Sequence, residues 1–315
     1  MFENIKDYPG YKVFTNGLRS YSQFAILLGL NSETQFRDIV KTFKRRVAAP
    51  FEPMLVNDGA IKENIFAANE IDLFKLPVPW WSEIDGGRYI GTWHINVTKD
   101  PESGLRNVGV YRMQILGPNQ TTVSVSPKSH IAFHMNKAEK KDQPLEMAAA
   151  IGVNETLIIS AAAALPYGTD EYNIAGGLEQ KPIELIKCGT VNLEVPANSE
   201  FVIEGIIKPG IRVQDGPYLD YAGIPSINRN AYLFKVTGLM YRNDPIFRGA
   251  SVGIPSGEDH ILFSVLSRLN LVDFHGSRIR QKIQNFLLKK RYFKAFQLSG
   301  RVGKLIHRNN ENINN

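Results

Sequence analysis

Apolar residues in the first fifty positions recur with the spacing of an amphipathic α-helix. This period predicts helices over residues 21–30 and 33–46. The second helix is expected to begin at Ser32, because Gln35 stands three positions later in a capping-box pattern.

Two further helices are expected later in the chain. Asn154 is expected to cap a helix through residues 158–165, because its side chain can accept a hydrogen bond from the first turn. Ser256 is expected to begin another helix, with Asp259 at the third helical position. The apolar positions of that helix are Ile261, Leu262, Val265, Leu266 and Leu269.

Elsewhere the pattern changes to short runs rich in β-branched and aromatic residues, which are typical of strands. These runs cover residues 89–98, 108–116, 121–126, 201–207, 231–237 and 239–242. Residues 100–104 and 215–217 have the composition of turns, and residues 208–210 are expected to end the fourth run. Clustered strands with helices between them predict an α+β fold built on an antiparallel sheet or a small barrel.

The composition excludes several classes of protein. With 315 residues, 43% of them hydrophobic, the chain is neither wholly disordered nor collagen-like. A single cysteine, Cys188, cannot form an internal disulfide. Residues 1–10 carry two acidic side chains and do not resemble a signal peptide. The longest apolar run, residues 157–165, is about half of what a spanning helix needs, so we expect a cytoplasmic protein without a membrane span.

The net charge of +6 is concentrated at the C-terminal end. Residues 274–310 contain ten basic residues and no acidic one, whereas residues 1–273 contain 27 basic and 30 acidic residues. Aromatic side chains lie among these basic residues, a mixture that single-strand nucleic-acid binders use. However, Ile279, Ile283 and Phe286 follow helical spacing, which favours an amphipathic helix with solvated charges. Nucleic acid is therefore not the expected partner.

The common cofactor and hydrolase motifs (GxGxxG, the P-loop, HExxH, paired CxxC and GxSxG) are absent from the sequence. Three polar clusters remain, at residues 98–114, at residues 127–132, and at residues 170–176 with 214–220. Taken singly, each is compatible with turns or with ordinary surface positions. The residues alone therefore predict an α+β domain without a defined activity.

Taken together, these clusters resemble the UbiD family of decarboxylases, which use prenylated FMN and are similar to 3-octaprenyl-4-hydroxybenzoate carboxy-lyase. The matching segments are residues 2–4, 8–10, 76–79, 85–90, 107–114, 193–197, 253–255 and 258–260. The order and number of these matches make the resemblance specific. It implies an antiparallel split-barrel flavin-binding core with flanking helices.

The resemblance also implies a set of site residues. A divalent metal, manganese or magnesium, would be held by Asn107, His130 and Glu171, with potassium as a further ion. Oxygen ligands with one imidazole suit such a metal. The flavin contacts would come from Thr92, Val110, Tyr111, Arg112, Ser126, Pro127 and Lys128. The catalytic trio would be Arg112, Asp215 and Asp220.

By the same resemblance, the reaction is a reversible, non-oxidative decarboxylation of an aromatic or α,β-unsaturated carboxylic acid. Asp220 would donate the proton, kept protonated by an enclosed site and by the like charge of Asp215, while Arg112 would pair with Asp215. A flavin prenyltransferase would supply the cofactor, and the chain is expected to form a homo-oligomer. The family usually has Glu at the first acid and Gly before the second, whereas this chain has Asp215 and Leu219.

The expected organisation has three parts: an N-terminal α/β segment at residues 1–80, the split-barrel cofactor domain at residues 81–255, and a helical basic tail at residues 256–315. A proline-rich hinge at residues 76–81 separates the first two parts. The chain looks shortened at both ends relative to the family, and the usual C-terminal domain is expected to be absent. An alternative is therefore a catalytically incomplete subunit that needs a partner chain. A second alternative is a non-enzymatic anion or nucleic-acid binder that acts through the tail.

Overall fold

The computed structural model describes residues 1–253 and 257–269. The chain divides into two units, Met1–Val272 and Asp273–Asn315, and the second lies outside the described residues. The expected tail helix, at Ile279 to Phe286, therefore also lies outside them. No helix within the described part of the chain is both long and apolar enough to cross a bilayer.

The described residues form six α-helices and fourteen strands. The helices are α1 (Tyr21–Leu27), α2 (Phe36–Val47), α3 (His130–Lys140), α4 (Glu155–Ala162), α5 (Glu171–Glu179) and α6 (Glu258–Arg268), with 3₁₀ turns η1 (Ala60–Lys62) and η2 (Leu73–Lys75). The strands are β1 (Lys12–Phe14), β2 (Met54–Leu55), β3 (Asn64–Ala67), β4 (Tyr89–Gly91), β5 (His94–Lys99), β6 (Arg106–Gly109), β7 (Met113–Gly117), β8 (Gln120–Val123), β9 (Leu145–Ile151), β10 (Glu184–Lys187), β11 (Glu194–Pro196), β12 (Phe201–Leu219), β13 (Pro225–Tyr241) and β14 (Ile246–Arg248).

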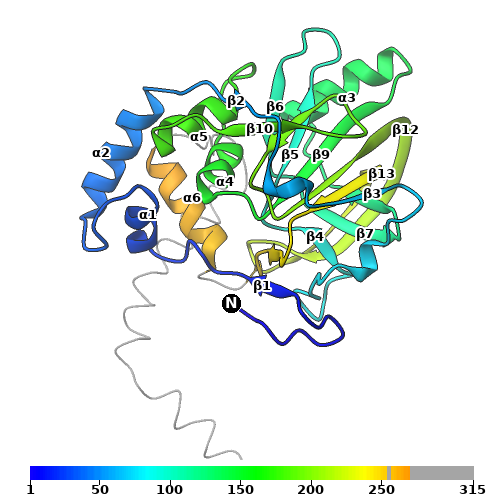
Figure 1. Ribbon diagram of the computed structural model, residues 1–315, viewed down its shortest axis with the longest axis horizontal. Coiled ribbons are helices and arrows are strands. Elements are labelled where there is room, and N and C mark those ends of the chain that lie inside the picture. Colours follow the sequence, from blue (N-terminus) through cyan, green and yellow to red (C-terminus); the bar gives the residue numbers. More distant parts are fainter. Residues whose placement is uncertain (254–256, 270–315) are drawn as a thin grey trace, which may run out of the picture. The chain divides into compact units, whose positions relative to one another are not determined.

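The largest sheet is antiparallel throughout and curves into a half-barrel (Figure 1). Its strand order is β4-β7-β8-β13-β12-β9-β5-β6, and β3 also pairs with β13. Two small sheets accompany it, one of β1 with β14 and one of β11, β10 and β2. The predicted α+β fold on an antiparallel sheet is confirmed.

Alternation along the central strands divides the apolar interior into two cores. On β9, Ala148 and Ala150 face one core, while Met147, Ala149 and Ile151 face the other. Side chains of a strand point alternately to its two faces, so both faces of β9 are buried. The first core is covered by α1, α2, α4, α5 and α6, which lie together on one side of the sheet, whereas α3 contributes to the second (Figure 1).

The predicted helices are present, but one of their predicted N-terminal caps was wrong. Asn154 caps α4 as predicted, and its side chain accepts a hydrogen bond from the amide of Thr156. The capping box predicted at Ser32 was wrong: α2 begins at Phe36. A turn stabilised by Asn31, whose side chain accepts from the amide of Glu33, occupies the preceding residues. The box instead forms in α1, between Ser20 and Gln23.

The helix expected from Ser256 is α6, which begins at Glu258 with Gly257 as its N-cap. Ser256 itself lies outside the described residues. Leu262, Val265 and Leu266 are buried, so the predicted apolar face is the face that packs against the first core.

Several strand boundaries differ from the prediction. Residues 208–210 do not end a strand, because β12 continues to Leu219 through a register shift between Ile207 and Arg212. A bulge of this kind tolerates the missing N–H of Pro209. The predicted turn at residues 215–217 also lies inside β12. Conversely, residues 108–116 form two strands, β6 and β7, around the connection at residues 110–112.

The sequence patterns missed the short strands β1, β2, β3, β10, β11 and β14, and also three longer elements, β9, α3 and α5. In β9 three alanines replace the usual β-branched residues, and in α5 two glycines weaken the helical pattern. A Cβ at Gly177 would lie 2.6 Å from the carbonyl oxygen of Arg46, so α5 needs glycine there to approach the preceding segment. In the proline-rich segment at residues 76–81, Leu76 and Val78 are buried in the second core, and the hinge role of this segment stays a prediction.

Candidate active site

Arg112 and the buried Asp215 form an ion pair between two distant parts of the sheet. Arg112 lies in the connection between β6 and β7, and its Nε and Nη2 atoms lie 2.6 and 2.5 Å from Asp215 Oδ1. The carboxylate of Asp215 has no exposed surface, and its Oδ2 accepts a hydrogen bond of 2.6 Å from Thr122 on β8. Both carboxylate oxygens are therefore occupied, and Asp215 holds Arg112 in one orientation.

The other side of the guanidinium contacts the ribbon of β12 and β13. Arg112 Nη1 donates to Ser226 Oγ at 2.8 Å, and the guanidinium lies 4.7 Å from the centre of the Tyr218 ring. Tyr218 and Ser226 are cross-strand partners, so the ribbon presents both to Arg112. Burial raises the pKa of the Tyr218 phenol, which keeps this surface of the site neutral.

Asp220, the third member of the predicted trio, lies at the turn between β12 and β13. Its Oδ1 accepts hydrogen bonds from the amides of Ala222 and Ile224, at 2.8 and 3.3 Å. The structure therefore brings Arg112 and Asp215 into direct contact and places Asp220 at the end of the same ribbon, with its carboxylate against the turn.

A segment preceding β4 packs against the same end of β12. The amide of Gly86 donates to the carbonyl of Pro217 at 2.7 Å, and a Cβ at Gly86 would lie 2.7 Å from the carbonyl oxygen of Gly216. Asp85 is buried, and its Oδ1 accepts from the amide of Leu219 at 2.9 Å. Burial raises the pKa of the Asp85 carboxyl, against the opposing effect of that hydrogen bond. Asp85 is a residue that the sequence reasoning used only for the family match.

The two oxygen ligands predicted for the metal are joined through the backbone of β6. Asn107 and Glu171 are both buried, and Glu171 Oε2 accepts from the amide of Val108 at 2.9 Å. Their neighbours in the chain, Arg106 and Asp170, form an ion pair of 3.1 Å. Two independent contacts therefore hold the start of α5 against β6.

Tyr111 connects this pair to the third predicted ligand. Burial raises the pKa of its phenol, as does the nearby charge of Glu171, while hydrogen bonds from Asn107, from the amide of Ile131 and from Ser129 oppose the rise. Ile131 and Ser129 are the chain neighbours of His130. The Tyr111 hydroxyl thus lies among segments that carry all three predicted ligands.

His130 is the first residue of α3, and it is partly buried. Its ring packs edge-on to Tyr167, with centroids 5.3 Å apart. Burial lowers the pKa of the imidazole, which favours the neutral form that binds metals. The pKa of Glu171 is raised by burial to about 8, so a cation beside it would relieve a desolvated carboxylate.

Within residues 1–253 and 257–269, no group of three or more His, Cys, Asp or Glu side chains could hold a metal. The predicted set is instead one imidazole, one carboxylate and one amide. Such a set suits a hard cation that receives additional charge from a bound phosphate.

The residues predicted to contact the flavin differ in exposure, and Val110, Tyr111 and Arg112 are partly buried. Thr92 is buried and its hydroxyl accepts from the amide of Ala250 at 2.9 Å. Ser126, Pro127 and Lys128 are exposed in the connection that leads into α3. Amides at a helix start attract phosphate, so the N-terminus of α3 and this connection fit the phosphate end of such a cofactor.

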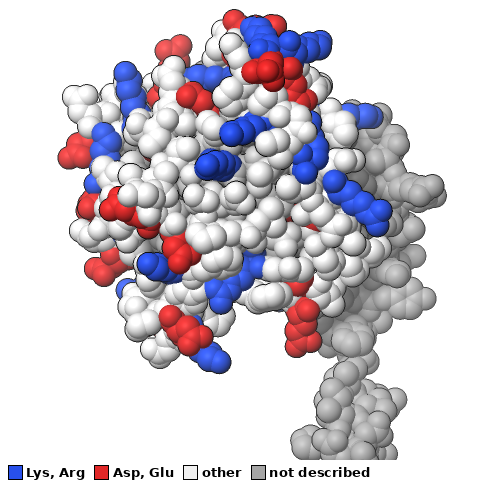
Figure 2. Space-filling model, turned by 90° about the vertical axis from the view of Figure 1, so that its right-hand side faces the viewer, with Lys and Arg blue, Asp and Glu red and all other residues white. Residues whose placement is uncertain are grey.

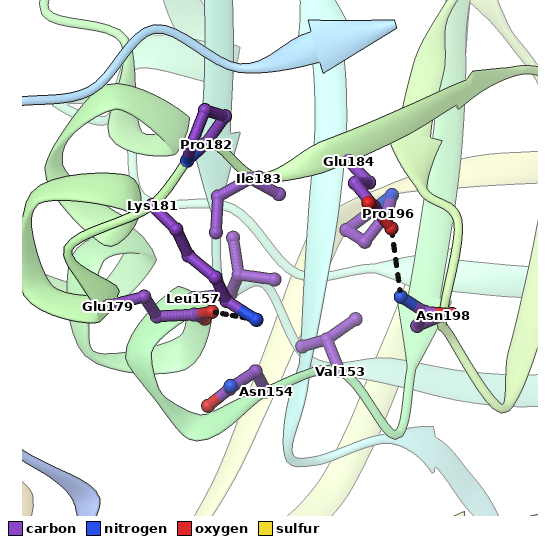
Figure 3. Close-up of a pocket in the computed structure, with 10 residues that line it drawn as sticks. All are labelled: Val153, Asn154, Leu157, Glu179, Lys181, Pro182, Ile183, Glu184, Pro196 and Asn198. Carbon is purple, nitrogen blue, oxygen red and sulfur yellow. Dashed lines mark hydrogen bonds and ion pairs between the residues drawn. The ribbon is translucent and has the colours of Figure 1, made fainter. Parts of the chain in front are cut away.

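A pocket of about 170 Å³ lies elsewhere, between α4, α5, β10 and β11 (Figure 3). Val153, Leu157 and Ile183 form its apolar part, and Glu179 lies 3.8 Å from Lys181 at its rim. None of the predicted site residues lines it.

The face of the molecule shown in Figure 2 carries both acidic and basic side chains. Acidic and basic side chains are interspersed there, with uncharged surface between them. The described residues of that face do not form the continuous basic stripe on which a nucleic-acid backbone would lie.

Residues 54–255 match the UbiD family, described as the 3-octaprenyl-4-hydroxybenzoate carboxy-lyase Rift-related domain. The chain is 30% identical over 283 residues to pyrrole-2-carboxylic acid decarboxylase of Pseudomonas aeruginosa, covering 87% of this chain and 57% of that protein. It is 34% identical over 274 residues to a phenolic acid decarboxylase of Sedimentibacter hydroxybenzoicus, covering 84% of this chain and 56% of that protein.

Solved structures of UbiD-class enzymes also resemble this chain. Vanillic acid decarboxylase of Sedimentibacter hydroxybenzoicus in its closed form matches with a TM-score of 0.78 and 32% identity, over 82% of this chain and 56% of that one. An evolved dimeric form of the UbiD-class enzyme HmfF from Pelotomaculum thermopropionicum, in complex with prFMN, matches with a TM-score of 0.75 and 34% identity, over 82% and 60%. The chain thus spans little more than half the length of these relatives. The matched segment includes every predicted site residue, and the chain belongs to the UbiD family.

Proposed function

We propose that this chain is a decarboxylase that binds prenylated FMN and a divalent metal and acts on an aromatic or α,β-unsaturated carboxylic acid. One observation carries the proposal. Residues 107–112 form one short segment. Val108 and Tyr111 in this segment contact the parts of the chain that hold the predicted metal ligands, and Arg112 contacts the buried Asp215. A short connection therefore links the residues proposed for the metal to those proposed for catalysis.

The residues fit the implied cofactor and metal. Asn107 and Glu171 offer oxygen atoms near the Tyr111 hydroxyl, and His130, whose chain neighbours Ser129 and Ile131 also contact that hydroxyl, offers an imidazole nitrogen. The prenylated flavin, when bound, supplies the electron sink that decarboxylation requires. Manganese is the proposed metal, with magnesium as the alternative and potassium as a further ion.

The chain's own residues would orient the substrate and move one proton. Arg112 is fixed by Asp215 and Ser226, and its side chain remains 19% exposed, so part of it would stay accessible to a carboxylate substrate. Asp220 would hold a proton on Oδ2 while Oδ1 continues to accept from the amides of the turn. It would deliver this proton to the carbon that loses CO2.

The test is co-expression with a flavin prenyltransferase, followed by absorbance spectroscopy and measurement of CO2 release from a panel of aromatic and α,β-unsaturated acids. We expect flavin absorbance in the purified protein. Turnover should fall at least 100-fold in Asp220→Asn and in Arg112→Ala. Asp142→Asn, which changes an exposed carboxylate outside the site, is the matched control. Full activity in the first two variants would contradict the assigned roles, and absence of bound flavin would contradict the function.

The metal set has a separate readout. Retention of manganese after dialysis, measured by elemental analysis, should be lost in Glu171→Gln and Asn107→Ala. Glu194→Gln, which changes a carboxylate bound by Lys99 and Arg106, should retain it.

We also propose a homo-oligomer, and light scattering on the purified chain tests this. Activity that requires a second, different chain would instead identify an incomplete subunit.

A further inference from the structure

Both chain neighbours of Asp220 are held by side chains from distant segments. The amide of Leu219 donates to Asp85 Oδ1 at 2.9 Å, and the carbonyl of Tyr221 lies 2.6 Å from His260 Nε2. Asp85 precedes β4, and His260 is in the first turn of α6. Asp220 therefore lies between two contacts that do not belong to its own hairpin.

The contact made by His260 does not depend on the charge of its ring. A carbonyl oxygen only accepts, so Nε2 carries the hydrogen of this bond. The other nitrogen, Nδ1, lies 3.2 Å from the amide nitrogen of Gly257 and 3.0 Å from Asp259 Oδ1. A neutral ring accepts from Gly257 and a protonated ring faces Asp259, and in both cases Nε2 donates to Tyr221.

Packing supports the same arrangement. The ring of Tyr221 lies 5.8 Å from that of Phe263 and 6.5 Å from that of His260, so one face of α6 covers it. A Cβ at Gly253 would lie 2.4 Å from the Leu219 side chain and 3.0 Å from the Asp220 carbonyl oxygen. The bare backbone of Gly253 therefore accommodates Leu219, the residue at which this chain departs from the family pattern.

Backbone hydrogen bonds close the turn and link Asp220 to its other residues. The amide of Gly223 donates to the carbonyl of Asp220 at 2.8 Å, and the amide of Asp220 donates to the carbonyl of Ile224 at 3.2 Å. A displacement of Tyr221 would therefore displace the carboxylate of Asp220 as well.

We propose that His260 is a positioning residue that sets the location of Asp220 by holding the carbonyl of Tyr221, with Asp85 holding the other side. The proposal rests on the proposed function, in which Asp220 is the proton donor. Positioning matters because a small misplacement of a catalytic group costs a large factor in rate.

The first test is hydrogen exchange of the turn amides in the full chain without cofactor. The side-chain amide of His260→Gln can place an N–H donor where Nε2 lies and so can still donate to the Tyr221 carbonyl. The shorter amide of His260→Asn extends only to the position of Nδ1 and cannot make this hydrogen bond. We expect the amides of Ala222, Gly223 and Ile224 to exchange at least tenfold faster in His260→Asn and at the wild-type rate in His260→Gln. Ser267→Ala, which removes a hydrogen bond within the same helix, is the matched control.

Unchanged exchange in His260→Asn would overturn the holding contact, whether or not the chain turns over any substrate.

The second test is kinetic. In the loaded enzyme, kcat should fall at least tenfold in His260→Asn with little change in KM, and His260→Gln should restore it. Faster exchange with an unchanged kcat would overturn the positioning role. A chain that shows no turnover in any form would refute the proposed function, and the exchange data would still decide the contact.

Discussion

At the scale of single residues, two buried threonines on β8 differ in whether their hydroxyl groups make hydrogen bonds. Thr121 and Thr122 are adjacent on β8, and both are fully buried. Thr122 donates to Asp215, whereas the Thr121 hydroxyl has no hydrogen-bond partner in the described part of the protein. The Thr122 hydroxyl also accepts from the amide of Gln114 at 2.9 Å, so this neighbouring pair separates the effect of a doubly hydrogen-bonded hydroxyl from that of burial alone.

We predict that Thr122→Val lowers the free energy of unfolding by about 2 kcal/mol, because it leaves the buried Asp215 Oδ2 atom without its donor and the amide of Gln114 without its acceptor. Thr121→Val should be neutral or slightly stabilising, because it removes a hydroxyl that makes no bond. Urea denaturation of both variants measures the difference. Equal losses would contradict the role given to the Thr122 hydroxyl.

His94 gives a prediction on pH. It is completely buried, and burial lowers its pKa from 6.5 to about 4. Between these values the unfolded chain binds more protons than the folded one, so the contribution of His94 is complete above pH 6.5 and decreases as the pH falls toward 4. The full loss is about 3 kcal/mol.

His94→Gln, which cannot take up this proton, should therefore show a smaller decrease of Tm between pH 7 and pH 4.5 than the wild type. Thermal melts at several pH values measure this. Parallel Tm curves for the two proteins would show that His94 does not cause the dependence.

At the scale of elements, β12 and β13 are the most informative part of the fold. β12 runs for 19 residues and carries Asp215 and Tyr218 near one end, where the turn holds Asp220. Its strand nature was predicted only for the first seven residues, because Pro209, Gly210 and Gly216 resemble turn signals. Register shifts absorb these residues, and such shifts depend on the partner strand rather than on local sequence.

Gly210 tests this account of the register shift. Its φ is +70°, and a Cβ there would meet no heavy atom within 4 Å. Gly210→Ala should therefore cost about 1 kcal/mol through backbone conformation alone. Gly189→Ala, at an equally open position without a positive φ, should cost nothing measurable. Chemical denaturation compares the two variants, and equal effects would contradict a conformational origin.

At the scale of the whole molecule, a buried charge network joins the N-terminal segment to α4, β14 and α6. Arg248 is 4% exposed and lies 2.7 Å from Glu155 and 2.5 Å from Glu258. Glu258 also accepts from the amide of Asn16 at 3.0 Å. Because α6 carries His260, this network also fixes the helix that holds the turn of Asp220.

We predict that Arg248→Met destabilises the protein by about 3–5 kcal/mol, because it leaves the buried carboxylate of Glu258 and the partly buried carboxylate of Glu155 without their cation. Arg242→Met, which breaks a more exposed pair with Glu200 at 3.5 Å, should change stability by about 0–1 kcal/mol. Denaturation midpoints measure both. A small effect in Arg248→Met would show that the network is not needed to hold these segments together.

The sequence by itself determined the fold class, the family and the segments that carry the candidate site. Periodicity and β-rich runs act locally, so they predicted the antiparallel α+β fold, and the ordered motifs identified the UbiD family. The metal, flavin and catalytic roles of individual residues stay predictions.

Only the tertiary structure decided which side chains meet. Arg112 and Asp215 are 103 positions apart, Leu219 and Asp85 are 134 apart, and Tyr221 and His260 are 39 apart. No local pattern records such pairings, because they arise when strand register and helix packing bring distant segments together. The same reason explains why the capping of α2, the extent of β12 and the place of Asp85 beside the site could not be predicted from the sequence.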